Sequence, residues 1–219
     1  MKRRHFLGIL TSATALAACS SNNVSLKTLR EVYDARFGKA SSFDPELPDT
    51  LPYASIAVTF KNWKKLLLIL GKVEGDEQHW ISEDRGVLVT RFGRIIKTVG
   101  LPEELLKTVF HSPDFFERTQ LTTPSAESAR RSIDLSPGNR YAVIVNSTLT
   151  PLGDMTAIQI GKHIRQVRCF EENGEATALS WRFTNRYWAD ASGFVWKSEQ
   201  QTSPNTPIIT IEVAKPYGN

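Results

Sequence analysis

Hydrophobic and polar residues alternate with a period of two along much of the chain from Tyr53 onward. In the first such run, Ile56, Val58 and Phe60 are separated by small or polar residues. Successive side chains of a β-strand point to opposite faces, so this alternation is typical of strands with one buried face. Together with a continuous Leu and Ile run, the pattern predicts strands at 54–60, 65–72, 78–82, 87–90, 95–99, 141–145, 156–160, 164–170, 176–187, 193–200 and 208–213.

Turn residues punctuate these runs at the spacing of an all-β domain. Glu74-Gly75-Asp76, Arg91-Phe92-Gly93-Arg94 and Asp190-Ala191-Ser192-Gly193 each join two predicted strands, and each contains a glycine. Short antiparallel strands with such turns are typical of β-sandwiches and barrels. We therefore predict a single mainly β domain over residues 26–219, built as an antiparallel sandwich or an incompletely closed barrel.

Three segments depart from the period of two. Leu26, Leu29, Val32, Tyr33 and Phe37 are spaced as on one face of a helix, which predicts one N-terminal amphipathic helix between Ser25 and Gly38. Residues 39–52 read as a loop. Residues 101–106 suggest a short helix with Pro102 in its first turn, and 111–138 read as an irregular connection with at most one short strand.

The first nineteen residues have the organisation of a bacterial secretion signal. Basic residues precede a short apolar stretch that ends in Leu16-Ala17-Ala18-Cys19, the pattern of a lipobox. A membrane-spanning helix needs about twenty apolar residues, and this stretch is shorter. We predict that residues 1–18 are a signal peptide, that Cys19 becomes the lipid-bearing N-terminus, and that 19–25 form a tether. The lipid then attaches the protein to a membrane.

The net charge of the chain falls when the predicted signal peptide is removed. The formal net charge is +4, but Lys2, Arg3 and Arg4 lie in the signal without any acid. The mature chain is therefore close to neutral, and nothing in its charge indicates nucleic-acid binding. Ser20 follows the cysteine where an Asp tends to retain lipoproteins at the inner membrane. We expect an outer-membrane location facing the periplasm of a gram-negative bacterium. The general and twin-arginine export routes both stay open.

An ordered set of segments resembles one known family, the YjbF/GfcB lipoproteins. The segments run from 51 to 55, 80 to 90, 93 to 102, 185 to 190 and 193 to 200, followed by Lys215-Pro216. The resemblance implies a mainly β, periplasm-facing outer-membrane lipoprotein that takes part in group 4 capsule or other exopolysaccharide production. It also implies envelope partners that include an outer-membrane barrel protein or another polysaccharide-export component. It brings no catalytic residues.

The residues themselves give little support to an enzyme. Glu83 and Asp84, with Glu74 and Asp76 nearby, are the candidates for a glycosidase pair, because such enzymes need two carboxylates flanking the bond. Acids in turns are ordinary, however, and we favour solvated turns.

The sequence also gives no clear indication of a metal site or a reactive thiol. His79, His111 and His163 lack metal-ligand spacing, and no nucleophile elbow or phosphate loop occurs. Cys169 lies in an alternating run, which favours a buried inert thiol. We expect no catalytic residue, no cofactor and no metal.

Aromatic and basic residues are the remaining candidates for binding. Tyr187, Trp188 and Trp196 lie on the two arms of one predicted hairpin, where an exposed ring can stack on a sugar or a partner. Large aromatics in β domains mostly fill the core or a partner surface, and this is the interpretation that we favour. A second set of candidates for an anionic polymer, or simply a solvated cluster balanced by Glu83 and Asp84, is Arg85, Arg91 and Arg94.

Three functions follow from these observations. The first is a non-enzymatic accessory lipoprotein in the assembly or export of exopolysaccharide or capsule, acting by docking to an envelope partner. The second is a polysaccharide-binding module that contacts the glycan through exposed aromatics. The third, with the least support, is a polysaccharide-modifying enzyme. An open sheet edge or apolar patch favours docking, an exposed aromatic row favours binding, and two buried carboxylates in a cleft favour the enzyme.

Overall fold

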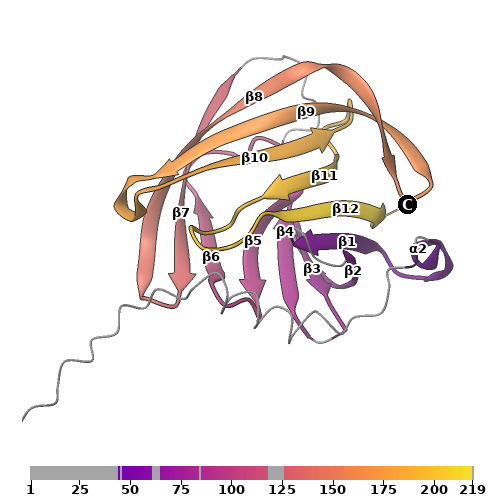
Figure 1. Cartoon of the computed structure of the whole chain (residues 1–219), viewed down its shortest axis with the longest axis horizontal. Coiled ribbons are helices and arrows are strands. Elements are labelled where there is room, and N and C mark those ends of the chain that lie inside the picture. The colour runs from indigo at the N-terminus through magenta and orange to yellow at the C-terminus, as the bar shows by residue number, and fades with distance from the viewer. Residues whose placement is uncertain (1–43, 45, 61–64, 84, 118–125, 219) are drawn as a thin grey trace, which may run out of the picture.

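The described strands form one antiparallel sheet of twelve (Figure 1). The computed structural model describes residues 44, 46–60, 65–83, 85–117 and 126–218. The predicted signal peptide, Cys19, the tether and the amphipathic helix at 26–37 lie outside these residues. The strands are β1 (Ser55–Phe60), β2 (Lys65–Glu74), β3 (Glu77–Ile81), β4 (Val87–Arg91), β5 (Arg94–Val99), β6 (Glu104–Phe110), β7 (Glu127–Ser136), β8 (Arg140–Ile160), β9 (His163–Ala176), β10 (Trp181–Ala189), β11 (Val195–Gln200) and β12 (Ile209–Lys215).

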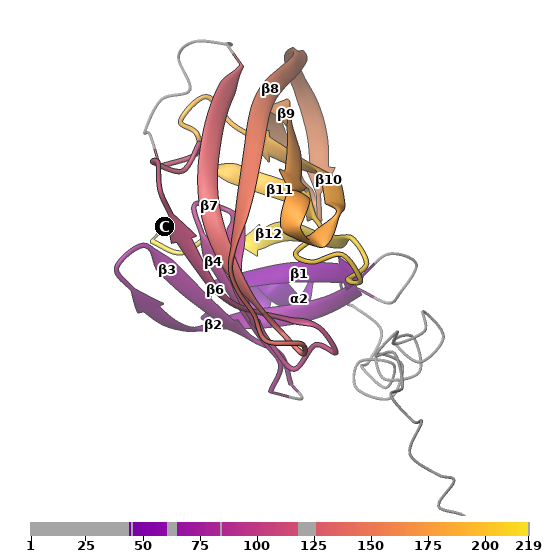
Figure 2. The same cartoon turned by 90° about the vertical axis from the view of Figure 1, so that its left-hand side faces the viewer.

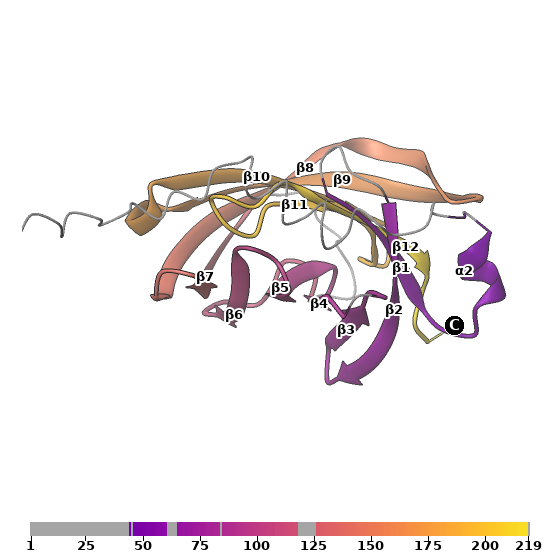
Figure 3. The same ribbon diagram turned by 60° about the horizontal axis from the view of Figure 1, so that its bottom comes forward.

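The sheet is a meander that curls into a nearly closed barrel. Its order is β5-β4-β3-β2-β1-β12-β11-β10-β9-β8-β7-β6, so the first and last strands pair and the two edges are β5 and β6. The edges lie side by side, because the Leu105 N–H donates to Thr98 Oγ1 (2.9 Å) and the Thr108 hydroxyl donates to the Ile96 carbonyl (3.0 Å). Figure 3 shows the sheet curling from β8–β11 round to β2–β6. Of the two predicted architectures, the open barrel is the one observed.

Alternation along the strands places the apolar side chains inside the barrel. β10 is the clearest case, because Trp181, Phe183 and Tyr187 are buried while Arg182 and Arg186 between them are exposed. The main core combines residues from both halves of the meander. A second buried cluster contains Phe115, Phe116, Leu149, Phe170, Tyr187, Ala189 and Val195.

The longest strands extend beyond the rest of the sheet. Figure 2 shows β7, β8, β9 and β10 standing next to one another. The ladder between β8 and β9 is irregular from Leu152 to Thr156 and then continues to the turn at Gly161. We call this distal hairpin, residues 156–167, the arm. Its tip meets the short helix α2 (Leu47–Thr50), where Lys162 Nζ lies 2.7 Å from Asp49 Oδ2.

Residues 101–106 are not a helix, as the sequence suggested, but lead into and begin β6. Glu104 Oε1 accepts the Gly100 N–H at 2.7 Å, at the start of the strand. The following residues pair with β7. The free edge of β7 therefore outweighs the local helix signal.

Other boundaries also differ from the prediction. The described part of 111–138 contains the ten-residue strand β7. Segments 141–145 and 156–160 belong to one strand, β8, and the predicted strand 176–187 is divided by a 3₁₀ turn at Thr177–Leu179. The loop predicted at 39–52 includes α2. Bulged and bent strands interrupt the regular alternation, so a pattern of period two divides them wrongly.

Candidate functional site

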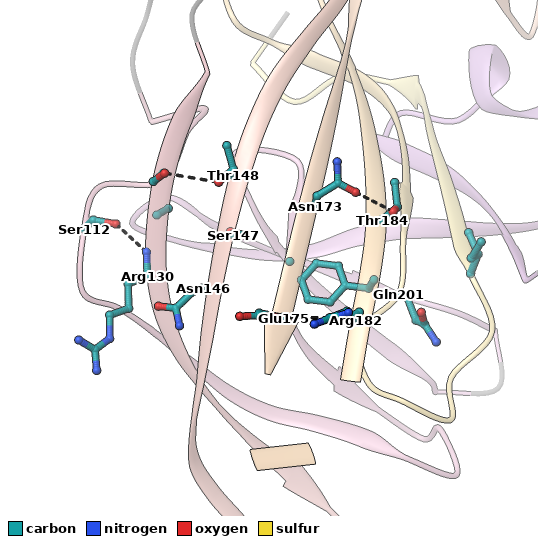
Figure 4. Close-up of a pocket in the computed structure, with 15 residues that line it drawn as sticks. Ser112, Arg130, Asn146, Ser147, Thr148, Asn173, Glu175, Arg182, Thr184 and Gln201 are labelled. Atoms are coloured by element: carbon teal, nitrogen blue, oxygen red, sulfur yellow. Dashed lines mark hydrogen bonds and ion pairs between the residues drawn. The ribbon is translucent and has the colours of Figure 1, made fainter. Parts of the chain in front are cut away.

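A large hollow lies on the outer face of β7–β10 and is open to solvent, with a volume of about 990 Å³ (Figure 4). We call it the polar groove. On each strand, exposed or half-buried side chains of the groove alternate with residues that face the barrel interior, some of which also reach its floor. On β8, for example, Asn146 is exposed and Thr148 is half-buried, while Ser147 is buried between them. Its lining residues include Ser112, Ser128, Arg130, Asn146, Thr148, Asn173, Glu175, Arg182, Thr184 and Gln201.

Strand register arranges the polar side chains of the groove in rows. The first row is Ser128, Thr148, Asn173 and Thr184, each opposite the next on the neighbouring strand. Within it, the Thr184 hydroxyl donates to Asn173 Oδ1 at 2.8 Å, and the Ser128 and Thr148 hydroxyl oxygens are 3.4 Å apart. Adjacent strands are about 4.8 Å apart, so the row offers hydrogen-bonding groups at that interval.

The second row consists of Arg130, Asn146, Glu175 and Arg182. Arg182 Nε lies 3.4 Å from Glu175 Oε2, whereas Arg130 has no ion-pair partner among the described residues. The Arg130 backbone N–H donates to Ser112 Oγ at 3.2 Å, which ties the edge of the groove to the end of β6. A guanidinium and an amide side by side can donate several hydrogen bonds in one plane.

Four charged side chains lie beneath the groove in the barrel interior. We call Arg94, Asp114, Arg131 and Glu172 the buried ion cluster. Arg94 Nε is 2.5 Å from Asp114 Oδ2, and Arg94 Nη1 is 2.7 Å from Glu172 Oε2. Arg131 Nη1 is 2.7 Å from Glu172 Oε1 and donates to Ser147 Oγ at 3.2 Å. Ser147 contributes to the groove, so the cluster supports its floor.

Neighbouring charges offset the cost of burial for Glu172 and Arg94. Burial works against the charge of Glu172, but Arg131 and Arg94 outweigh it and hold the pKa of Glu172 well below its usual range. Burial also opposes the charge of Arg94, yet Asp114 and Glu172 raise its pKa well above the usual value. Burial raises the pKa of Tyr187, whose protonated hydroxyl donates to Glu172 Oε2 at 3.0 Å. Two cations and two anions therefore balance within the barrel.

The buried ion cluster is suited to structure more than to acid catalysis. A carboxylic acid that donates a proton near neutral pH needs a raised pKa. Glu172 has the opposite shift and is fully buried. Its partners come from β5, β7 and β10, so its chemistry is to join strands across the barrel.

The structure separates the three aromatic candidates. Tyr187 is 0% exposed and faces the barrel interior, so its side chain is not available to a glycan or a partner. Trp188 points to the other face, is half-buried, and has Lys197 Nζ 4.9 Å from its ring centroid. Trp196 is 9% exposed, with the Arg165 guanidinium of the arm 3.8 Å from its ring centroid. Packing accounts for most of their surface, and none of them lines the polar groove.

The arginine candidates are also dispersed. Arg94 is 3% exposed in the buried ion cluster, so the solvated cluster balanced by Glu83 and Asp84 does not describe it. Arg91 remains at the surface and lies 3.3 Å from Glu117 and 3.9 Å from Asp76. Arg85 is exposed in a turn with a positive φ of 67°.

The acids considered as a glycosidase pair lie at exposed positions where the structure describes them. Glu74 and Asp76 flank the β2–β3 turn, and Glu74 bonds Lys72 at 2.8 Å. Glu83 is exposed, and Asp84 lies outside the described residues.

No metal-binding group was found in the described part of the chain. Among those residues, no three or more His, Cys, Asp or Glu side chains are placed together so that they could hold a metal ion. Likewise, no helix of those residues is long and apolar enough to span a membrane.

Sequence reasoning missed the groove residues. Their signal was present as polar pairs two residues apart, such as Asn146 and Thr148 or Asn173 and Glu175. Only the strand register shows that these pairs lie opposite one another.

Comparisons with known proteins agree on the relatives of this chain. The sequence model of the YjbF family, described as group 4 capsule polysaccharide lipoprotein GfcB and YjbF, matches residues 30–213. The uncharacterized lipoprotein GfcB of Escherichia coli K12 is 26% identical over 169 residues, which are 76% of this chain and 78% of that protein. The uncharacterized lipoprotein YjbF of the same organism is 24% identical over 187 residues, or 84% and 85%.

A solved structure shares the fold. The crystal structure of the hypothetical lipoprotein YmcC of E. coli K12 superposes with a TM-score of 0.71 at 22% identity, covering 91% of this chain and all of that one. The family match spans most of the described barrel and the flanking sequence. The chain therefore belongs to the YjbF family of group 4 capsule polysaccharide lipoproteins.

Proposed function

We propose that this protein is a non-enzymatic accessory lipoprotein in the assembly or export of a capsule or other exopolysaccharide, and that it binds the polymer in the polar groove. It is anchored through lipid on Cys19 to the outer membrane and faces the periplasm. The family supports the link to polysaccharide. The lipobox and Ser20 support the anchor and its location.

The chemistry of the polar groove is the observation that carries the proposal. Sugars present many hydroxyls, and the groove offers hydroxyl, amide, guanidinium and carboxylate groups that can pair with them. The groove is open and crosses four strands, so a long polymer can lie along it. In this proposal, Arg130, Asn146 and Asn173 bind the sugar by hydrogen bonding, and aromatic stacking is not needed.

A non-enzymatic role agrees with the distribution of acids. The buried carboxylates Glu103, Asp114 and Glu172 are each ion-paired with an arginine. The one acid that lines the groove, among the described residues, is Glu175, which is paired with Arg182. Glycosidases of the common type need two carboxylates at the bond.

The test is binding of the purified polysaccharide from the native envelope to the full chain in detergent micelles, by affinity electrophoresis. Arg130→Ala with Asn173→Ala removes two donors from different rows. We expect at least a tenfold loss of affinity, in line with about 1 kcal/mol for each hydrogen bond. Lys97→Ala, an exposed substitution on β5, is the control. Equal binding by the double variant and the wild type contradicts the proposal.

Docking to an envelope protein is the second candidate, favoured by the surface near the arm. Leu152, Met155 and Ile164 are exposed there, with Ile164 at 71%. Exposed apolar side chains of this kind mark interaction sites when they gather. Detergent co-purification from the native envelope tests it. Recovery of an outer-membrane barrel or another export component by the wild type, and its loss with Ile164→Asp, supports docking. Retention with Ile164→Asp places the contact elsewhere.

A further inference from the structure

A second cavity of about 450 Å³ opens at one mouth of the barrel, away from the polar groove. Three hairpin turns surround it, namely β2–β3 at Gly75, β4–β5 at Gly93 and β10–β11 at Gly193. The C-terminal Tyr217 completes the rim. We call this cavity the mouth pocket.

The walls of the mouth pocket are aromatic and aliphatic. Trp80, Phe92, Phe116, Phe194 and Val73 contribute to them, and they come from segments on opposite sides of the barrel. Phe194 is 36% exposed and Tyr217 is 57% exposed, so apolar surface faces solvent at the entrance. Ligand sites in barrel mouths are concave and largely apolar, commonly of about 300–1,000 Å³.

Several polar groups of the wall are already engaged by the protein. Thr90 Oγ1 accepts the Trp80 indole N–H at 2.8 Å, and Ser198 Oγ accepts from Gln200 Nε2 at 2.9 Å. Glu117 accepts from Arg91 at 3.3 Å and from the Asp114 N–H at 3.2 Å. Asp76, Gln78 and Lys197 also line the pocket, but most of its lining surface is apolar, which suits a hydrocarbon.

The floor of the mouth pocket is hydrogen-bonded and closely packed. Gln200 lies beneath it, donating to the Gly93 carbonyl at 2.8 Å, and its Oε1 accepts the Ile95 N–H at 2.9 Å. Gly93 has a positive φ of 81°, and a Cβ there would lie 2.5 Å from that of Val195. Because the wall is preformed, a ligand need not order it on binding.

We infer that the mouth pocket binds the alkyl chain of a lipid. Burying an alkyl chain in such a pocket removes apolar surface from water, so affinity should rise with each methylene that enters. Two sources share this chemistry: the acyl chains predicted on Cys19 of the protein itself, and a separate envelope lipid. The inference goes beyond the proposed function, since it involves a different surface and a different ligand.

Photocrosslinking in isolated envelope membranes tests this inference. A diazirine analogue of palmitate is added to membranes that contain the full chain, and crosslinked peptides are mapped by mass spectrometry. We expect adducts in segments 73–80 and 192–198. Phe194→Asp places a charge at the entrance and Val73→Trp fills the pocket, and each should reduce these adducts at least fivefold. Tyr141→Asp, which changes an exposed aromatic of β8, is the matched control.

The Cys19→Ser variant, which cannot be lipidated, distinguishes the two sources of the alkyl chain. Equal labelling of both proteins indicates a separate lipid. Stronger labelling of Cys19→Ser indicates that the acyl chains of the protein normally occupy the pocket. Absence of adducts in both segments in both proteins overturns the inference, as do adducts that persist in Phe194→Asp and Val73→Trp. Polysaccharide binding at the polar groove should be unchanged in Phe194→Asp, so the two proposals can fail separately.

Discussion

Arg94 Nη1 and Glu172 Oε2 lie 2.7 Å apart inside the barrel, and both side chains are almost completely removed from solvent. The two residues are 78 positions apart in the chain. Arg94 belongs to β5, one edge of the sheet, and Glu172 belongs to β9 on the far side. The pair therefore ties the edge strand to the wall that carries the polar groove, in addition to the few hydrogen bonds between β5 and β6.

Removing one partner of this pair should lower the free energy of unfolding of the protein. Glu172→Gln leaves Arg94 and Arg131 facing a neutral amide, and breaking a buried ion pair costs about 3–5 kcal/mol of unfolding free energy. Urea unfolding of the full chain in detergent measures it. Glu175→Gln, an exposed acid on the same strand, should change stability by less than about 0.5 kcal/mol. Equal midpoints for the two variants would show that the buried pair contributes nothing.

The same carboxylate should make the protein sensitive to acid. The pKa of Glu172 is depressed in the folded state, so the unfolded chain binds this proton more readily. The stability from Glu172 is complete above the ordinary glutamate pKa of about 4.3 and is lost as the pH falls below it toward the folded pKa. Melting temperatures between pH 7 and pH 3 should fall more steeply for wild type than for Glu172→Gln. Parallel curves would contradict this assignment.

A glycine sets the packing beneath the polar groove. A Cβ at Gly174 would lie 2.1 Å from Phe183 Cζ, so Gly174→Ala must displace the ring from the core. Overpacking of this kind costs about 1–3 kcal/mol. In a double-mutant cycle with Phe183→Leu, Gly174→Ala should lower the free energy of unfolding by less, because leucine has no ring at this position. Additive effects of the two substitutions would mean that the contact does not limit the packing.

The sequence predicted the strands well where the alternation was regular and the turns contained glycine. The hairpins joined at Gly75, Gly93 and Gly193 are present as expected. It failed where strands are bulged or long, as in β8, and where a local helix signal competed with distant pairing, as in β6. Whether the sheet closes as a barrel depends on β5 meeting β6, which no local pattern encodes.

The sites were less predictable than the fold. Arg94 was grouped with nearby charges, but its counter-ions are 20 and 78 residues away. Adjacent Tyr187 and Trp188 do point to opposite faces, as a strand requires, yet the buried one is the hydrogen-bonding Tyr187. The polar groove depends on the register of four strands, and the mouth pocket depends on three turns meeting.

Cys169 provides a further test of the packing. The residue is half-buried opposite Trp188 on β10, and burial raises the pKa of its thiol. Alkylation requires the thiolate, so a raised pKa and limited access both slow it. If Cys19 carries lipid, Cys169 is the one thiol of the mature chain. Iodoacetamide labelling at pH 8 should be at least tenfold slower for the folded protein than in urea, with mass spectrometry locating the adduct. Rapid labelling of the folded protein would instead indicate an accessible, reactive thiol on this face.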